Sequence, residues 1–124
     1  MERSKHTYRH LDMLGQSSAT SPLRVIALVD FDAFYAQCEV VRLGLSPTMP
    51  LAVQQWNAII ALNYPALECG PNRGASVEEA RKACPEIVLQ HVATWREGET
   101  TWAYRPDFAK HMSTDKSALD PYRL

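Results

Sequence analysis

The pattern of apolar and polar positions changes near residue 33. Residues 24–30 form a short apolar run rich in β-branched side chains, which predicts a strand buried on both faces. From residue 34 onward the apolar side chains recur at the spacing of one helix face, so a helix is expected to follow at once. Asp32 is suited to cap the start of that helix. The predicted apolar stripe consists of Phe34, Cys38, Val41 and Leu45.

The middle of the chain alternates between strand and helix signals. Two strand-like runs, 51–56 and 59–64, flank a dipeptide at residues 57–58 that suits a tight hairpin turn. Ser76 and Glu79 have the spacing of a capping box, which predicts a short helix with one apolar face. Further expected elements are a helical turn at 8–14, a strand at 87–92 and a helix at 106–112. The pattern as a whole predicts an α/β fold.

Composition narrows the function classes without selecting one. The 124 residues suffice for one compact domain, and 46% hydrophobic with 22% charged residues is typical of a globular chain. A formal charge of −1 provides no bulk positive field for nucleic acid, although a local basic patch is compatible with it. The longest apolar runs, such as 25–29 and 58–62, are far shorter than a membrane span, so no membrane partner is expected.

The cysteines indicate reduced thiols in an intracellular compartment. Cys38, Cys69 and Cys84 are an odd number at wide spacing, which argues against a disulfide framework. None of them forms a C-x-x-C pair or a metal-type spacing with a histidine, so the sequence predicts no thiolate metal site.

The segment that points to chemistry is 28–37, LVDFDAFYAQ, where the predicted strand ends in Asp30 and Asp32. A carboxylate at the end of a strand can ligate a hard cation, and a helix N-terminus offers N–H groups to a phosphate. Together they could hold a metal–triphosphate complex. The alternative is purely structural, with Asp30 closing the strand and Asp32 capping the helix.

The order of several motifs resembles that of Y-family translesion DNA polymerases, and the chain is identified as a member of that family over roughly residues 23–123. Residues 28–37 resemble the family's opening motif, and the likeness continues in sequence order. The other segments that carry it are 50–56, 59–66 and 79–85, and residues 7–11 and 91–98 resemble the fungal-type eta branch.

The resemblance implies a role for each matching residue. Asp30 resembles the catalytic, metal-binding carboxylate, and the backbone carbonyl of Phe31 a second ligand of the same Mg²⁺ ion. Tyr35 resembles the steric gate that excludes a ribose 2′-OH. The remaining implied contacts with the nucleotide are the backbone at Phe34 and Tyr35, the hydroxyl of Tyr64 and the side chain of Arg73, and Gln55 resembles a template contact.

Structural roles are the alternative at these positions. Phe34 and Tyr35 suit core aromatics, and Tyr64 suits the end of a strand. Arg73, beside glycines and a proline, suits a solvated loop, and Gln55 suits an exposed strand position.

Two departures from the family pattern affect the expected activity. Leu67 stands where the family has a phosphate-binding arginine, which removes a charge-assisted contact. Pro71 stands where an aliphatic residue usually packs below the Arg73 loop. The chain also ends before the family's second carboxylate motif, and residues 76–80 resemble that motif only in wording, since the capping box explains them.

The resemblance further implies an organisation and partners. We expect a flexible arm at 1–22, followed at 23–124 by the N-terminal part of a UmuC-like catalytic domain, with fingers at about 46–95. The fold would be a partial palm, consisting of its first strand and helix, joined to a small α/β fingers subdomain. The implied partners are a deoxynucleoside triphosphate and primer–template DNA, bound weakly by this chain, and a sliding clamp only through regions outside it.

Two functions therefore remain open for this sequence. One is translesion DNA synthesis and repair in the nucleus by nucleotidyl transfer, with the chain alone inactive because one carboxylate cannot hold two Mg²⁺ ions. The alternative is a non-catalytic module that binds a nucleotide or a protein.

Overall fold

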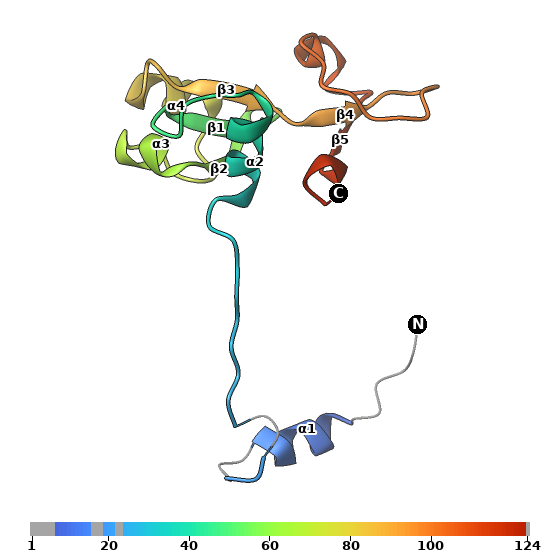
Figure 1. Cartoon of the computed structure of the whole chain (residues 1–124). Coiled ribbons are helices and arrows are strands. Elements are labelled where there is room, and N and C mark those ends of the chain that lie inside the picture. The colour runs from blue at the N-terminus through green and yellow to red at the C-terminus, as the bar shows by residue number, and fades with distance from the viewer. Residues whose placement is uncertain (1–6, 16–18, 22–23, 124) are drawn as a thin grey trace. The chain divides into compact units, whose positions relative to one another are not determined.

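The structure is a computed structural model that describes residues 7–15, 19–21 and 24–123. It consists of two units, residues 1–31 and 32–124, which are described separately (Figure 1). No helix in the described ranges has the length and apolar composition needed to cross a bilayer.

The first unit contains one helix and an extended segment. Helix α1, Tyr8–Gly15, confirms the helical turn expected at 8–14. The predicted buried strand at 24–30 is wrong for this structure, because the segment has no strand hydrogen bonds and Leu28 is 92% exposed. A strand needs a hydrogen-bonded neighbour, and every strand among the described residues pairs elsewhere. Much of the expected arm at 1–22 lies outside the described residues.

The second unit is organised around a three-stranded sheet in the order β2-β1-β3. Strands β1, Leu51–Gln55, and β2, Ala58–Leu62, form an antiparallel hairpin, and β3, Val88–His91, lies parallel to β1. The two-residue turn expected at 57–58 therefore forms one residue earlier, at 56–57. The strand expected at 87–92 is confirmed as β3.

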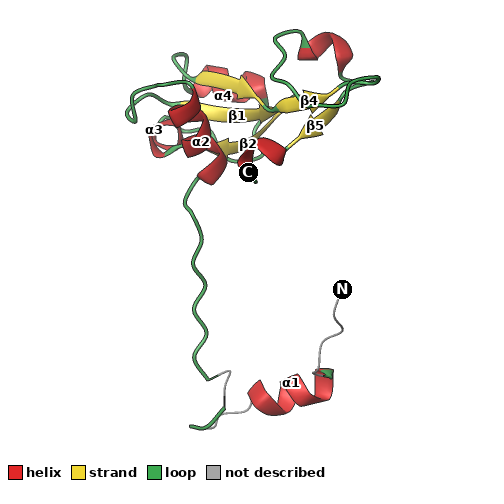
Figure 2. Ribbon diagram, turned by 45° about the vertical axis from the view of Figure 1, so that its right-hand side comes forward, coloured by secondary structure: helices red, strands yellow, loops and turns green. Residues whose placement is uncertain are grey.

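Helices cover both faces of this sheet, as the alternation of side chains along β1 requires (Figure 2). Leu51 and Val53 pack on the face covered by α2, Phe34–Arg42. Ala52 points to the other face, where α3, Tyr64–Glu68, and α4, Val77–Ala83, contribute buried residues.

A smaller two-stranded sheet follows β3 directly. Strands β4, Ala93–Trp95, and β5, Lys116–Ala118, pair antiparallel. Between and after them lie two short 3₁₀ helices, η1, Phe108–His111, and η2, Asp120–Tyr122. The helix expected at 106–112 is thus only one 3₁₀ turn, and β4 and β5 were not predicted because residues after 93 lack a clear apolar alternation.

Helix α2 buries the predicted apolar face only in part, since Cys38 and Leu45 pack against the core whereas Val41 does not. Val41, on the predicted stripe, is 80% exposed, whereas Ala36, Glu39 and Val40 face the core. The reason is that the Glu39 carboxylate is fully hydrogen-bonded inside the protein. A periodicity analysis assigns a charged residue to solvent and so rotates the helix incorrectly.

His91 holds the sharp turn of the hairpin from the neighbouring strand. Trp56 has a left-handed φ of 53°, and its backbone N–H donates to Nε2 of His91 at 2.9 Å. Because Nε2 accepts, the ring proton lies on Nδ1, which donates to the Val92 carbonyl at 2.7 Å. The imidazole stacks on Phe108 with ring centroids 3.9 Å apart. Burial lowers the pKa of His91, in keeping with this neutral form.

Asn63 ties the start of α3 to the sheet through three hydrogen bonds. Its Oδ1 accepts from the Ala66 N–H, capping α3, and from the Leu51 N–H at 2.9 Å. Its Nδ2 donates to the Met49 carbonyl at 2.8 Å. The buried amide thus satisfies β1 and α3 together.

Replacing Asn63 by Ala should lower the free energy of unfolding by about 2–4 kcal/mol, because buried backbone groups lose their partners. Chemical denaturation measures this. Asn72→Ala, at an exposed position, is the matched control and should change stability by less than about 0.5 kcal/mol. Equal losses in the two variants would contradict the role given to Asn63.

Candidate functional site

The candidate metal ligands belong to the first unit. Asp30 is exposed, and its Oδ1 accepts from the Phe31 backbone N–H at 3.0 Å. This local hydrogen bond orients the Asp30 carboxylate and uses only its Oδ1.

These residues do not fit a complete Mg²⁺ site. Mg²⁺ takes six oxygen ligands, several of them commonly waters or substrate phosphates. Asp30 and the Phe31 carbonyl offer one carboxylate and one backbone oxygen, so other oxygens would have to complete the coordination of even one ion. Among the described residues, the group of three potential ligands that lies close together is Cys69, Cys84 and Glu86, which is not a hard-oxygen set. No metal-dependent step follows from this chain's own ligands.

Asp32 joins the start of α2 to the start of α3. It does not cap α2 as predicted: the N-cap is Ala33, in a left-handed conformation without a side-chain cap. Instead, Asp32 Oδ2 accepts from the Tyr64 hydroxyl at 2.7 Å. This hydrogen bond, together with the charge of Asp32, raises the pKa of Tyr64. Tyr64 begins α3 rather than ending a strand, a start that Asn63 and Pro65 could have signalled.

Tyr35 is held by an aromatic stack. Its ring lies nearly parallel to that of Tyr122, with centroids 4.4 Å apart and an interplanar angle of 18°. Phe34, the preceding residue, is 39% exposed and lies outside the buried core clusters, so the core role considered for it is wrong. Tyr35, in contrast, packs against the buried core cluster on the side of the sheet that α2 covers.

A buried carboxylate fixes the partner in this stack. Glu39 Oε1 accepts from the hydroxyls of Tyr122 at 2.7 Å and Tyr104 at 2.9 Å, and Oε2 accepts from Arg42 Nε at 2.6 Å. The Arg42 guanidinium also lies 3.6 Å above the Tyr104 ring. Burial and the bond to Glu39 raise the pKa of Tyr104 to about 12, and the same two causes raise the pKa of Tyr122. We call Glu39, Arg42, Tyr104 and Tyr122 the Glu39 network.

The sequence offered little sign of the Glu39 network. Glu39 and Arg42 are three residues apart on a helix, which is a common exposed pair. Their tyrosine partners are 65 and 83 residues away from Glu39 in the chain.

Arg73 is exposed on a loop docked against β2. The Gly74 N–H donates to the Ile59 carbonyl at 2.9 Å, and the Ile59 N–H donates to the Ala75 carbonyl at 2.9 Å. Pro71, which precedes Arg73 in this loop, is buried. The loop therefore presents Arg73 to solvent on a fixed backbone.

Gln55 is half-buried at the end of β1, and its Nε2 donates to Ser117 Oγ at 2.6 Å. It thus connects the larger sheet to β5. The exposed strand position considered for Gln55 is wrong, since the side chain is half-buried, and its contact with a template stays a prediction.

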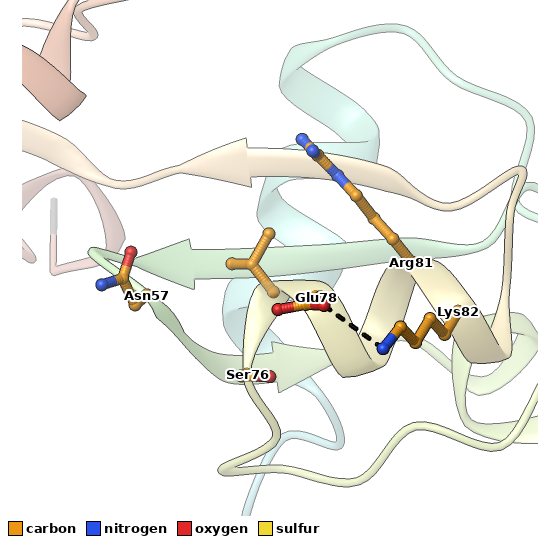
Figure 3. A pocket seen from close by; sticks show the side chains of 6 residues that line it. Asn57, Ser76, Glu78, Arg81 and Lys82 are labelled. Carbon is orange, nitrogen blue, oxygen red and sulfur yellow. Dashed lines mark ion pairs between the residues drawn. The ribbon is translucent and has the colours of Figure 1, made fainter.

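A pocket of about 640 Å³ opens beside α4, and none of the predicted site residues lines it (Figure 3). Its edge includes the confirmed capping box, in which Ser76 Oγ accepts from the Glu79 N–H and Glu79 returns a bond to the Ser76 N–H. Glu78 pairs with Lys82 across one turn at 3.2 Å. The Ser-Val-Glu-Glu segment is thus a helix start, as the sequence predicted.

Comparison with known proteins decides the family. The chain matches the family described as impB/mucB/samB over residues 29–122. It belongs to this family. The inferred resemblance to Y-family translesion polymerases of the eta branch is confirmed by relatives that include DNA polymerase eta of Saccharomyces cerevisiae, which is 39% identical over 97% of this chain.

The matched relatives are much longer than this chain. N-acetyltransferase eso1 of Schizosaccharomyces pombe is 45% identical over 98% of the chain, which spans 14% of that relative. The corresponding span of the S. cerevisiae polymerase is 21%. The solved structure of DinB from Sulfolobus solfataricus is 29% identical, with a TM-score of 0.48 over 50% of this chain and 19% of DinB. The α/β fold class agrees with this impB/mucB/samB assignment.

Within this impB/mucB/samB chain, the predicted residues divide between the two units. Asp30 and Phe31 lie in the first, and the other candidates lie in the second. Leu67, predicted to stand at the family's arginine position, is 42% exposed on α3, one turn after Tyr64. The functional roles themselves stay predictions.

The bond between Asp32 and Tyr64 can be tested by titration. Asp32→Asn should lower the pKa of Tyr64 toward its ordinary value, because a neutral amide stabilises the protonated phenol less than a carboxylate does. NMR of ¹³C-labelled tyrosine side chains measures the pKa. Glu78→Gln is the control and should leave it unchanged. A Tyr64 pKa unaffected by Asp32→Asn would show that the bond does not form in solution.

Proposed function

We propose that this chain contributes the nucleotide-contacting part of a translesion DNA polymerase of the Y-family. Relatives named DNA polymerase eta and DNA polymerase iota support the family role. The proposed partners are a deoxynucleoside triphosphate and primer–template DNA, and the proposed location is the nucleus.

The fixed ring of Tyr35 is the observation on which this proposal depends. A steric gate works only if its aromatic wall cannot swing away from a ribose 2′-OH. Stacking on Tyr122 restrains the Tyr35 ring, and the hydroxyl of Tyr122 is bound by the buried Glu39. The Glu39 network therefore supplies the rigidity that discrimination between sugars requires.

The first turn of α2 suits a triphosphate in the same proposal. A helix start has N–H groups without intrahelical acceptors and a partial positive charge, and no side chain caps this one. Those N–H groups include the backbone N–H of Tyr35. A phosphate bound there would therefore place the sugar of the nucleotide near the Tyr35 ring. Arg73 would add a positive charge from its exposed loop.

The chain alone is proposed to bind without catalysing transfer. In-line phosphoryl transfer by two metal ions needs several carboxylates, whereas Asp30 provides one. The second candidate function, a non-catalytic nucleotide-binding module, is favoured by this same shortage of ligands.

Titration of the whole chain with dCTP and CTP in the presence of Mg²⁺ tests the proposal. We expect dCTP to bind about tenfold more tightly than CTP, equivalent to ~1.4 kcal/mol. Tyr35→Ala should bring the two affinities within about twofold by removing the wall. Tyr8→Ala, on the exposed helix α1, is the control and should keep the preference.

Three outcomes would contradict this proposal. Equal binding of dCTP and CTP by the unchanged protein would refute the gate, and absence of binding would leave only a structural or protein-interaction role. Primer extension by the chain, lost in Asp30→Ala, would refute its proposed inactivity.

A further inference from the structure

Two cysteines and a glutamate that are separated in sequence meet where α3 and α4 end. The sulfur atoms of Cys69 and Cys84 and a carboxylate oxygen of Glu86 lie within 4.8 Å of one another. We infer that these three residues, the Cys69–Cys84–Glu86 cluster, form a binding site for a thiophilic divalent cation of the Zn²⁺ class. This site is separate from the proposed nucleotide-contacting residues.

The fold brings the two thiols together at the ends of two helices. Cys69 is the C-cap of α3, and Cys84 is the C-cap of α4. Gly70 follows with φ of 117°, and a Cβ at this position would lie 3.9 Å from the Cβ of Ala83, so the two helix ends approach closely. The separation of 15 residues concealed this pair from an analysis of spacing.

The electrostatic surroundings favour a cation between these groups. The C-terminal carbonyls of helices carry partial negative charge, and Glu86 adds a full one. In the described part of the chain, no Lys, Arg or His forms an ion pair with Glu86. Burial, Cys69 and the charge of Glu86 raise the pKa of Cys84 to about 11. The cluster thus gathers donors without a positive partner.

The donor set and its spacing suit a tetrahedral soft cation. In a tetrahedral site, zinc–sulfur bonds of ~2.3 Å hold two thiolate sulfurs about 3.8 Å apart. This separation is compatible with the sulfurs of Cys69 and Cys84, which lie within 4.8 Å of each other. A backbone hydrogen bond from Glu86 to Cys84 opposes the net rise of the pKa of that thiol and would support a bound thiolate. Water would complete the coordination.

Binding must release protons for charges and atoms to balance. Each thiol loses its proton as its sulfur bonds to the ion, so one Zn²⁺ displaces two protons, and affinity should rise with pH. A disulfide is the competing chemistry for neighbouring thiols.

The test uses the reduced, metal-free chain titrated with Co²⁺ and Zn²⁺. We expect one ion per chain, with Co²⁺ giving a thiolate-to-metal charge-transfer band and a tetrahedral visible spectrum. Zn²⁺ should displace Co²⁺ and raise the melting temperature, because the ion closes the segment 69–84.

Single substitutions distinguish metal binding at the Cys69–Cys84–Glu86 cluster from binding at Cys38, the third cysteine. Cys69→Ser should weaken binding by more than about a hundredfold, and Glu86→Gln by about tenfold, with the charge-transfer band retained in the latter. Cys38→Ser is the matched control, since Cys38 is also half-buried, and it should bind normally. Cys84→Ser should also abolish the charge-transfer band. If loss of the buried Cys84 thiol unfolds the chain, Cys69→Ser still tests the site.

The inference is overturned if the reduced chain binds no Co²⁺ or Zn²⁺, or if Cys69→Ser binds as well as the unchanged protein. It is also overturned if Cys38→Ser weakens binding as much as Cys69→Ser. Formation of a Cys69–Cys84 disulfide without any metal binding by the reduced form would assign the pair to redox chemistry instead. None of these results depends on whether the chain binds a nucleotide.

Discussion

The buried carboxylate of Glu39 is the interaction on which the second unit depends. It joins α2 to residues that follow β4 and β5 by accepting from Tyr104 and Tyr122, and it pairs with Arg42. A buried carboxylate destabilises a protein unless both of its oxygens are hydrogen-bonded. Both oxygens of Glu39, which is 0% exposed, have hydrogen-bond partners. The sequence-distant partners are therefore held in one arrangement, and Tyr122 in turn holds the ring of Tyr35.

The same arrangement relates the fold to its proposed chemistry. The Asp32–Tyr64 bond sets the starts of α2 and α3 beside each other, and Asn63 fixes the start of α3 to β1. A rigid aromatic wall and an uncapped helix start are thus built from ordinary packing and hydrogen bonds. The Arg73 loop is tied to β2 by backbone bonds and presents its charge outward.

The sequence predicted those elements whose signals are local. The β1–β2 hairpin and the capping box of α4 follow from short-range patterns and agree with the structure. Residues 24–30 read as a strand but lack one here, since strand formation depends on a neighbour that local sequence cannot supply. The buried face of α2 and the meeting of Cys69 with Cys84 depend on partners far along the chain, so periodicity and spacing could not reveal them.

A double-mutant cycle between Glu39→Gln and Tyr122→Phe, measured as free energies of unfolding, tests the central claim most directly. If Glu39 fixes Tyr122, the two substitutions should be non-additive by at least ~1 kcal/mol, because each removes the same buried hydrogen bond. Additive effects, within about 0.3 kcal/mol, would show that the two side chains act independently and that Glu39 does not hold the aromatic stack in place.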